Sequence, residues 1–166
     1  IDRNRILELT NGVVLSLRED TYIFGTLNPT SLRDYAGTQS LNKAFADRWV
    51  IWDKPFPNKE QLDAIFEKRY PKLQKEYREL IIKLATEINN SFMSDDISIN
   101  IETPMSLRTI VERIPIGLDV YADSVDPLKD TWENFVLPHV NKEDLDHYKT
   151  LWNTIVRKGP SIKPKL

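Results

Sequence analysis

Residues 24–49 read FGTLNPTSLRDYAGTQSLNKAFADRW, and the fold is decided in this stretch. It begins inside an apolar run, residues 22–27, which is typical of a strand covered on both faces of an α/β sheet. The run ends at Asn28-Pro29, a dipeptide that favours a turn. Residues 41–48 then predict a short helix, and residues 49–52 predict another strand. A buried strand, a polar turn, a helix and a second strand in this order predict an α/β core.

Two polar side chains stand at the ends of these elements. Asn28 follows the predicted buried strand, at the carboxyl end where ligands bind in open α/β sheets. Taken alone, Asn-Pro is a common turn opener and needs only a structural role. Arg48 follows the predicted helix and, taken alone, is a solvated helix end beside Asp47. The combination of the two in one segment indicates more than a turn and a surface charge.

Before this segment the sequence predicts a β-hairpin. Asn11-Gly12 is a strong turn dipeptide, and residues 13–17 have the composition of a strand. Residues 6–9 are interpreted as the end of a helix. The chain begins with Ile1 rather than Met, inside sequence that already reads as structured, so we expect a fragment or a processed piece.

Pro55 and Pro57 break regular structure and predict a boundary between two parts, residues 1–57 and residues 58–166. The first part is expected to hold strands of a partial αβα sheet and the second to be helical, in a chain dominated by helix. Beyond the prolines, the hydrophobic period changes from two to about 3.6. Capping signals and apolar spacing predict five helices, beginning after Asn58, near Leu73, after Thr103-Pro104, after Asp126-Pro127 and near Lys142. The basic end, residues 158–165, is expected to be loose.

Composition restricts the classes of function. The chain has no cysteine, which excludes disulfides, thiolate nucleophiles and Cys-ligated zinc. Its 23 Lys plus Arg and 25 Asp plus Glu are scattered, so there is no electrostatic footprint for nucleic acid. No apolar stretch approaches the roughly 20 residues of a membrane helix. Neither a nucleic acid nor a membrane is therefore expected as a partner, and the cytoplasm is the default location.

The sequence also lacks the parts that would hold a triphosphate. None of its five glycines opens a G-x-x-x-x-G-K-[ST] loop, whose backbone amides would bind phosphate groups. No Asp-Glu pair ends an apolar strand. His139 and His147 lack the carboxylate pattern of a metal site and are interpreted as surface histidines on helices. We predict no metal ligand in this chain.

The segment of residues 24–49 runs from the predicted buried strand to an Asp-Arg-aromatic end, and it includes Asn-Pro, Tyr-x-Gly-Thr and Leu-Asn elements. It resembles the sensor-one-to-arginine-finger block of AAA+ ATPases of the MoxR/CbbQ-like kind. These are relatives of the dynein and midasin modules, and the resemblance is specific over residues 21–52. It implies that Asn28 is the sensor-one residue, which orients the attacking water and detects the γ-phosphate. It implies that Arg48 is the arginine finger, whose guanidinium enters the nucleotide site of the neighbouring subunit.

A third match lies in the helical part. Ser106-Leu107-Arg108 begins a predicted helix, and the family places Ser-x-Arg at the start of a lid helix. The resemblance implies that Arg108 is the sensor-two residue, which contacts the phosphates of ATP. Taken alone, Arg108 is equally well explained as a surface arginine on an amphipathic helix. The hairpin at Asn11-Gly12 matches the insertion hairpin of this clade, and it is equally well explained as an ordinary β-hairpin.

The resemblance implies a homo-oligomeric ring, expected to be a hexamer, in which hydrolysis of ATP with Mg²⁺ drives remodelling of an unidentified protein or complex. Because this chain has no phosphate loop, we expect it neither to hydrolyse ATP nor to bind it tightly by itself. Two other interpretations stay open. One is a non-catalytic helical scaffold or adaptor with an AAA+-like shape. The other is an unrelated α-rich binding domain. A phosphate loop in the upstream sequence would separate the first interpretation from these two.

Overall fold

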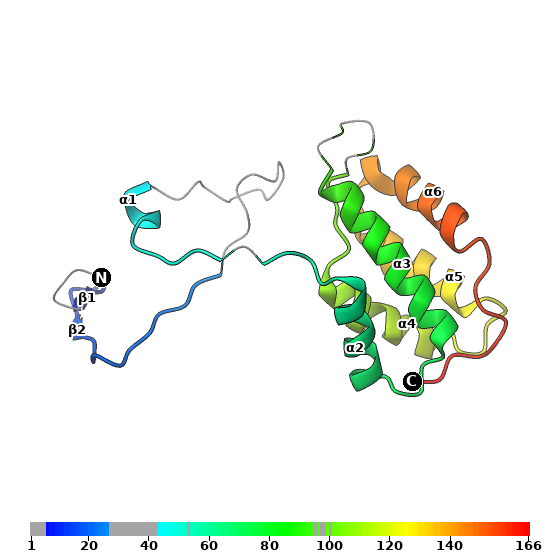
Figure 1. Cartoon of the computed structure of the whole chain (residues 1–166), viewed down its shortest axis with the longest axis horizontal. Helices are drawn as coiled ribbons and strands as arrows, with labels where there is room; N and C mark the ends of the chain where they lie inside the picture. The colour runs from blue at the N-terminus through cyan, green and yellow to red at the C-terminus, as the bar shows by residue number, and fades with distance from the viewer. Residues whose placement is uncertain (1–5, 27–42, 53, 95, 97–98, 100) are drawn as a thin grey trace. The chain divides into compact units, whose positions relative to one another are not determined.

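The computed structural model describes residues 6–26, 43–52, 54–94, 96, 99 and 101–166. The chain divides into two compact units, Ile1–Arg48 and Trp49–Leu166. Helix dominates the described residues, as the sequence predicts (Figure 1). No helix among them is both long enough and apolar enough to cross a membrane.

In the described residues of the first unit, a small β-hairpin precedes one short helix. β1 (Ile6–Glu8) pairs antiparallel with β2 (Val14–Ser16). Gly12 lies in the turn with a φ of 80°, a conformation that glycine adopts without steric penalty, and its N–H donates to the carbonyl of Leu9 at 2.9 Å. The hairpin predicted at Asn11-Gly12 is confirmed. The helix end predicted before it is wrong, because β1 occupies that position.

The three-stranded partial sheet is not formed by the described residues. β2 matches the strand predicted over residues 13–17, but residues 21–26 and 49–52 contain neither helix nor strand. Their large apolar side chains are exposed, with Phe24 at 89% and Trp52 at 87%. A strand buried on both faces needs neighbouring strands to satisfy its backbone N–H and C=O groups. The described part of the chain supplies no such neighbours, so an apolar run alone does not make a strand here.

The second unit consists of helices. Residues 49–52 and 54–57 lead into it without regular structure, and Phe56 packs edge-on against Phe92 with ring centroids 5.9 Å apart. Five continuous helical segments follow among the described residues, and the first two are α2 (Lys59–Arg69) and α3 (Lys75–Phe92). The third helix consists of residues 107–108, η1 (Thr109–Arg113) and α4 (Ile114–Val120). The fourth helix consists of α5 (Pro127–Thr131), η2 (Trp132–Val136) and η3 (Leu137–His139), and the fifth consists of η4 (Lys142–Asp144) and α6 (Leu145–Ile155). Each of the five predicted helices is present.

α3 packs against α2, α6 and η1 (Figure 1). Its buried apolar side chains recur three, four or seven residues apart and form the stripe that the sequence predicts. They are Tyr77, Ile81, Ile82, Leu84, Ala85, Ile88 and Phe92. This stripe is the centre of the apolar core of the second unit.

Two contacts fix the fourth helix in place. Trp132 stacks on Trp152 with ring centroids 5.1 Å apart and on Tyr148 at 5.7 Å, and all three rings are buried. On another side, Gly117 of α4 lies so close to Thr131 that a Cβ atom at Gly117 would be 2.5 Å from the Thr131 Cγ2. A larger residue at Gly117 would push the third and fourth helices apart. These two helices carry facing walls of the site described below.

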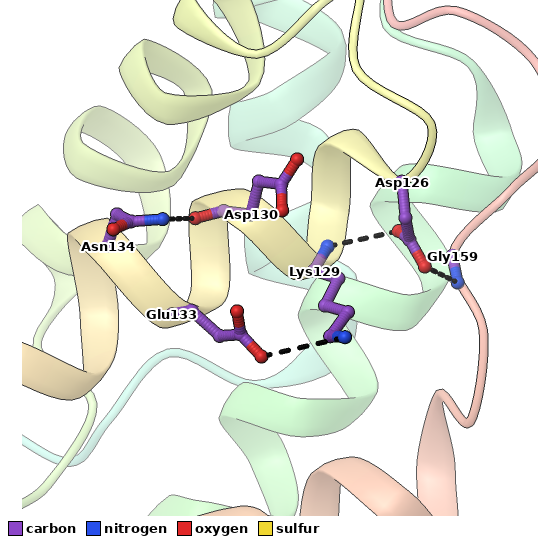
Figure 2. Close-up of polar contacts among 6 residues, drawn as sticks. All are labelled: Asp126, Lys129, Asp130, Glu133, Asn134 and Gly159. Carbon is purple, nitrogen blue, oxygen red and sulfur yellow. Dashed lines mark hydrogen bonds and ion pairs between the residues drawn. The ribbon is translucent and has the colours of Figure 1, made fainter.

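The basic C-terminal stretch is held against the helices, which contradicts the loose end predicted from its composition. Asp126 caps α5 by accepting a hydrogen bond from the Lys129 N–H at 3.1 Å, and it accepts a second from the Gly159 N–H at 3.1 Å (Figure 2). The hydroxyl of Tyr77 donates to the carbonyl of Ile162 at 2.7 Å. Burial, with a smaller contribution from the Asp126 charge, raises the pKa of Tyr77 to about 12, so this donor keeps its proton at neutral pH. Backbone groups of the tail make these contacts, and the Lys163 ammonium adds an ion pair with Asp123, so a basic composition alone does not indicate whether the tail is bound.

Candidate functional site

A pocket of about 530 Å³ lies at the start of the third helix. Its lining comes from the loop before that helix, from the first two turns of the helix, from the end of the fourth helix and from Tyr148 of α6. Cavities of this size are typical of small-molecule sites.

Basic side chains define the charge of this pocket. Arg108, Arg113 and His139 line it, and none of the lining residues is acidic. Within the part of the chain that the structure describes, neither guanidinium forms an ion pair or a hydrogen bond. Guanidinium groups in a cavity without a carboxylate partner favour the binding of an anion, and they match the geometry of phosphate oxygens. The pocket is therefore a candidate anion site.

Ser106 caps the helix that carries the two arginines. Its Oγ accepts a hydrogen bond from the Thr109 N–H at 3.1 Å, which is the bond of an N-cap. The sequence predicts the cap at Thr103-Pro104 instead, and the structure corrects this start to residue 107. Arg108 lies in the first turn of this helix. Thr103 is unavailable as a cap because it contributes to the contacts that hold the preceding loop.

Two buried polar side chains hold that loop in place. The amide of Asn89 donates to the carbonyl of Met105 at 3.1 Å, and its Oδ1 accepts from the Met105 N–H at 2.9 Å. The carboxylate of Asp144 accepts from the N–H groups of Glu102 at 3.1 Å and Thr103 at 2.7 Å. Asn89 is 7% exposed and Asp144 is 4% exposed, so water competes little for these bonds. The loop wall is therefore fixed before any ligand binds.

Tyr148 adds a third anchor to the same wall. Its hydroxyl donates to the carbonyl of Thr103 at 2.8 Å. Burial, with a smaller contribution from the charge of Asp144, raises the pKa of Tyr148 well above its usual range. The hydroxyl therefore stays protonated and remains a donor at neutral pH. A site whose walls are positioned by such contacts is preorganised for its ligand.

The residues that the AAA+ resemblance assigns are placed as follows. Asn28 lies outside the described residues. Arg48 is exposed and lies shortly after α1 (Lys43–Ala46) in the first unit, where the sequence predicts the short helix. Arg108 lies in the second unit and lines the pocket. Of the three, Arg108 is the residue that lines a cavity formed by the described residues.

Sequence reasoning missed Arg113 and His139. His139, interpreted as a surface residue on a helix, is exposed and lines the pocket from η3. Arg113 is five residues after Arg108, and in an α-helix two such residues differ by roughly 140° around the axis, so they do not face one site. The signal that could have found Arg113 is Pro115, because a proline inside a helix changes the geometry of the turn before it.

Comparison of the chain with protein-family models, with curated proteins and with solved structures found no match. Among the described residues, no three His, Asp or Glu side chains come together in a group that could hold a metal ion. The relation to AAA+ ATPases therefore stays a prediction from the residues, and the anion pocket around Arg108 is the feature on which a function can be built.

Proposed function

We propose that this chain is the C-terminal part of an AAA+ ATPase module of the MoxR/CbbQ-like kind, and that its helical unit is the lid over bound ATP. The observation that carries the proposal is the pocket. Arg108, the residue that the family pattern assigns to the nucleotide phosphates, lines a cavity with basic and no acidic side chains. A guanidinium placed in this way binds phosphate oxygens through two parallel hydrogen bonds.

The exposed apolar segments support the α/β part of the proposal. Residues 22–24 and 49–52 present large hydrophobic side chains to solvent, among them Tyr22, Phe24, Val50 and Trp52. Contiguous apolar surface of this kind marks a region that another part of a protein covers. We propose that both segments become strands of a partial αβα sheet of the P-loop type. The other strands, the phosphate loop and the Mg²⁺ ligands would come from upstream sequence.

In the assembled protein the proposed roles belong to two nucleotide sites. Asn28 orients the attacking water at one site, and Arg108 binds the phosphates of the same ATP from the lid. Arg48 reaches the site of the neighbouring subunit, so hydrolysis requires a homo-oligomeric ring, which we expect to be a hexamer. The energy released would drive remodelling of a protein or complex.

In the full-length protein, Arg108→Ala is expected to weaken ATP binding by roughly ten- to hundredfold. The reason is that hydrogen bonds to charged groups contribute about 1.5–3 kcal/mol, and each 1.4 kcal/mol changes the dissociation constant about tenfold. Isothermal titration with ATP and Mg²⁺ measures the change.

Lys83→Ala is the control, because Lys83 is an exposed basic residue of the same unit and is not part of the pocket lining. Equal affinity of the wild type and the Arg108→Ala variant would contradict the lid assignment. Full-length rings that assemble but neither bind nor hydrolyse ATP would favour the scaffold or adaptor interpretation.

A further inference from the structure

Two helices of this chain contain a π-helical turn, and both turns border the same cavity. They are η1 (Thr109–Arg113) and η2 (Trp132–Val136). π turns make up well under about 1% of residues in proteins and occur frequently at functional sites. η1 contributes Thr109 and Arg113 to the pocket lining, and η2 contributes Val136. The pocket is therefore bounded by both π turns that the described residues contain.

η1 determines which way Arg113 faces. The N–H of Ile114 donates to the carbonyl of Thr109, five residues earlier, instead of four as in an α-helix. A turn with this spacing holds more residues than an α-helical turn, so it rotates residue 113 toward the side of residue 108, from which α-helical geometry would separate it by roughly 140°. Arg113 and Arg108 consequently line one cavity.

A proline follows each π turn, Pro115 after η1 and Pro138 after η2. Proline has no N–H to donate and its ring collides with the carbonyl four residues earlier, so a wider turn relieves the collision. The widened helical turn at both positions is therefore explained by the proline that follows it in the sequence.

Side-chain donors also stabilise the two π turns. The hydroxyl of Tyr70 on the second unit donates to the carbonyl of Val111 at 2.8 Å within η1. At the start of η2, the amide of Asn134 donates to the carbonyl of Asp130 at 2.8 Å (Figure 2). The Val111 carbonyl lies four residues before Pro115, which has no N–H to donate, so the Tyr70 hydroxyl replaces the missing donor there. The positions of Arg113 and Val136 in the pocket are thus held by specific contacts.

We propose that Arg108, Arg113 and His139 form one polyphosphate site, in which Arg113 binds a second phosphoryl group beside the one bound by Arg108. Arg108 and Arg113 both line the cavity, and neither has an ion-pair or hydrogen-bond partner among the described residues, so two linked phosphoryl groups can be bound by one guanidinium group each. Two guanidinium groups and an imidazole, with no acidic side chain among the lining residues, suit a ligand that carries several negative charges. The identification of this polyphosphate with that of ATP rests on the proposed function, whereas the polyphosphate site itself does not.

The test uses the 166-residue chain and inorganic pyrophosphate at constant ionic strength. NMR signals of the Arg108 and Arg113 Nε–H groups and of the His139 ring are followed during the titration, with inorganic phosphate and chloride as comparisons. We expect all three residues to respond together to pyrophosphate, with a dissociation constant at least about tenfold lower than that for phosphate. Equal affinity for pyrophosphate and phosphate would overturn the inference.

Arg113→Gln is expected to weaken pyrophosphate binding about tenfold, and Lys83→Gln, which changes an exposed basic residue of α3 outside the pocket lining, is expected to leave it unchanged. Arg113→Lys keeps the charge without the planar fork and is expected to lose affinity by a smaller factor, which covers the case in which Arg113→Gln does not fold. Wild-type affinity in a folded Arg113 variant would refute the polyphosphate site. Pyrophosphate binding by this chain, with no ATP binding by the full-length protein, would reject the proposed function and support the site. Normal ATP binding by a full-length Arg113→Gln variant would reject the identification of this polyphosphate with that of ATP and leave the proposed function standing.

Discussion

In rings assembled from the full-length protein, Arg48→Ala is expected to lower ATP hydrolysis by about 10³-fold while ATP affinity stays nearly unchanged. An arginine finger neutralises charge that develops as the γ-phosphoryl group is transferred, and it accelerates hydrolysis by roughly 10³ to 10⁵ where its role is known. A 10³-fold loss corresponds to about 4 kcal/mol in the activation free energy. The position of Arg48 suits this role, because the residue is exposed and lies shortly after a helix. A side chain that reaches a second subunit must be exposed in its own subunit.

Steady-state hydrolysis and nucleotide titration of the same ring preparation measure the two quantities. Arg48→Lys keeps the charge but loses bidentate geometry, so an intermediate rate is expected. Arg18→Ala provides the control, since Arg18 is an exposed arginine of the same unit that pairs with Asp20 at 3.1 Å. If Arg48→Ala lowered affinity and rate by the same factor, the residue would belong to the binding of its own nucleotide and not to a neighbouring site.

Asp144→Ala is expected to lower the free energy of unfolding of this chain by about 3 kcal/mol. The substitution removes the acceptor of the Glu102 and Thr103 N–H groups at a position closed to water. Each hydrogen bond to a charged group contributes about 1.5–3 kcal/mol, and a buried N–H left without an acceptor is penalised by a similar amount. Urea unfolding followed by helical circular dichroism measures the change.

Two variants bracket this expectation. Asp144→Asn keeps an acceptor oxygen of nearly the same shape and is expected to lose less stability. Asp146→Ala changes an exposed carboxylate two residues further along and is expected to stay within about 0.5 kcal/mol of the wild type. A value for Asp144→Ala as small as that for Asp146→Ala would show that this carboxylate does not hold the pocket wall. Weaker pyrophosphate binding by Asp144→Ala would connect the stability of the loop with the site.

The helices were predictable because their signals are local. Asn58 and Gln61 form both bonds of the capping box expected from their spacing, at 3.0 and 2.9 Å. Asp126 caps α5 with Pro127 behind it, and Asn11-Gly12 closes the hairpin. Each of these features depends on residues within a few positions of one another. Arg108 was singled out through the family resemblance, because the Ser-x-Arg spacing by itself is equally well explained by a surface arginine.

The pocket and the strands were not predictable in the same way. The loop wall depends on Asn89 and Asp144, whose bonds join residues 16 and 41 positions apart, and no local pattern reports them. The orientation of Arg113 depends on a π turn, which an analysis based on a period of 3.6 does not contain. An apolar run such as residues 22–27 indicates which side chains a strand would bury, but it does not indicate whether partner strands are present.

The most direct measurement is the structure of the full-length assembly with a non-hydrolysable ATP analogue and Mg²⁺. The account predicts that the side chains of Asn28 and Arg108 lie within hydrogen-bonding distance of the phosphates of one nucleotide, and that Arg48 reaches the nucleotide of the adjacent subunit. A bound analogue whose phosphates contact neither Arg108 nor Asn28, with the two side chains on separate surfaces, would contradict it.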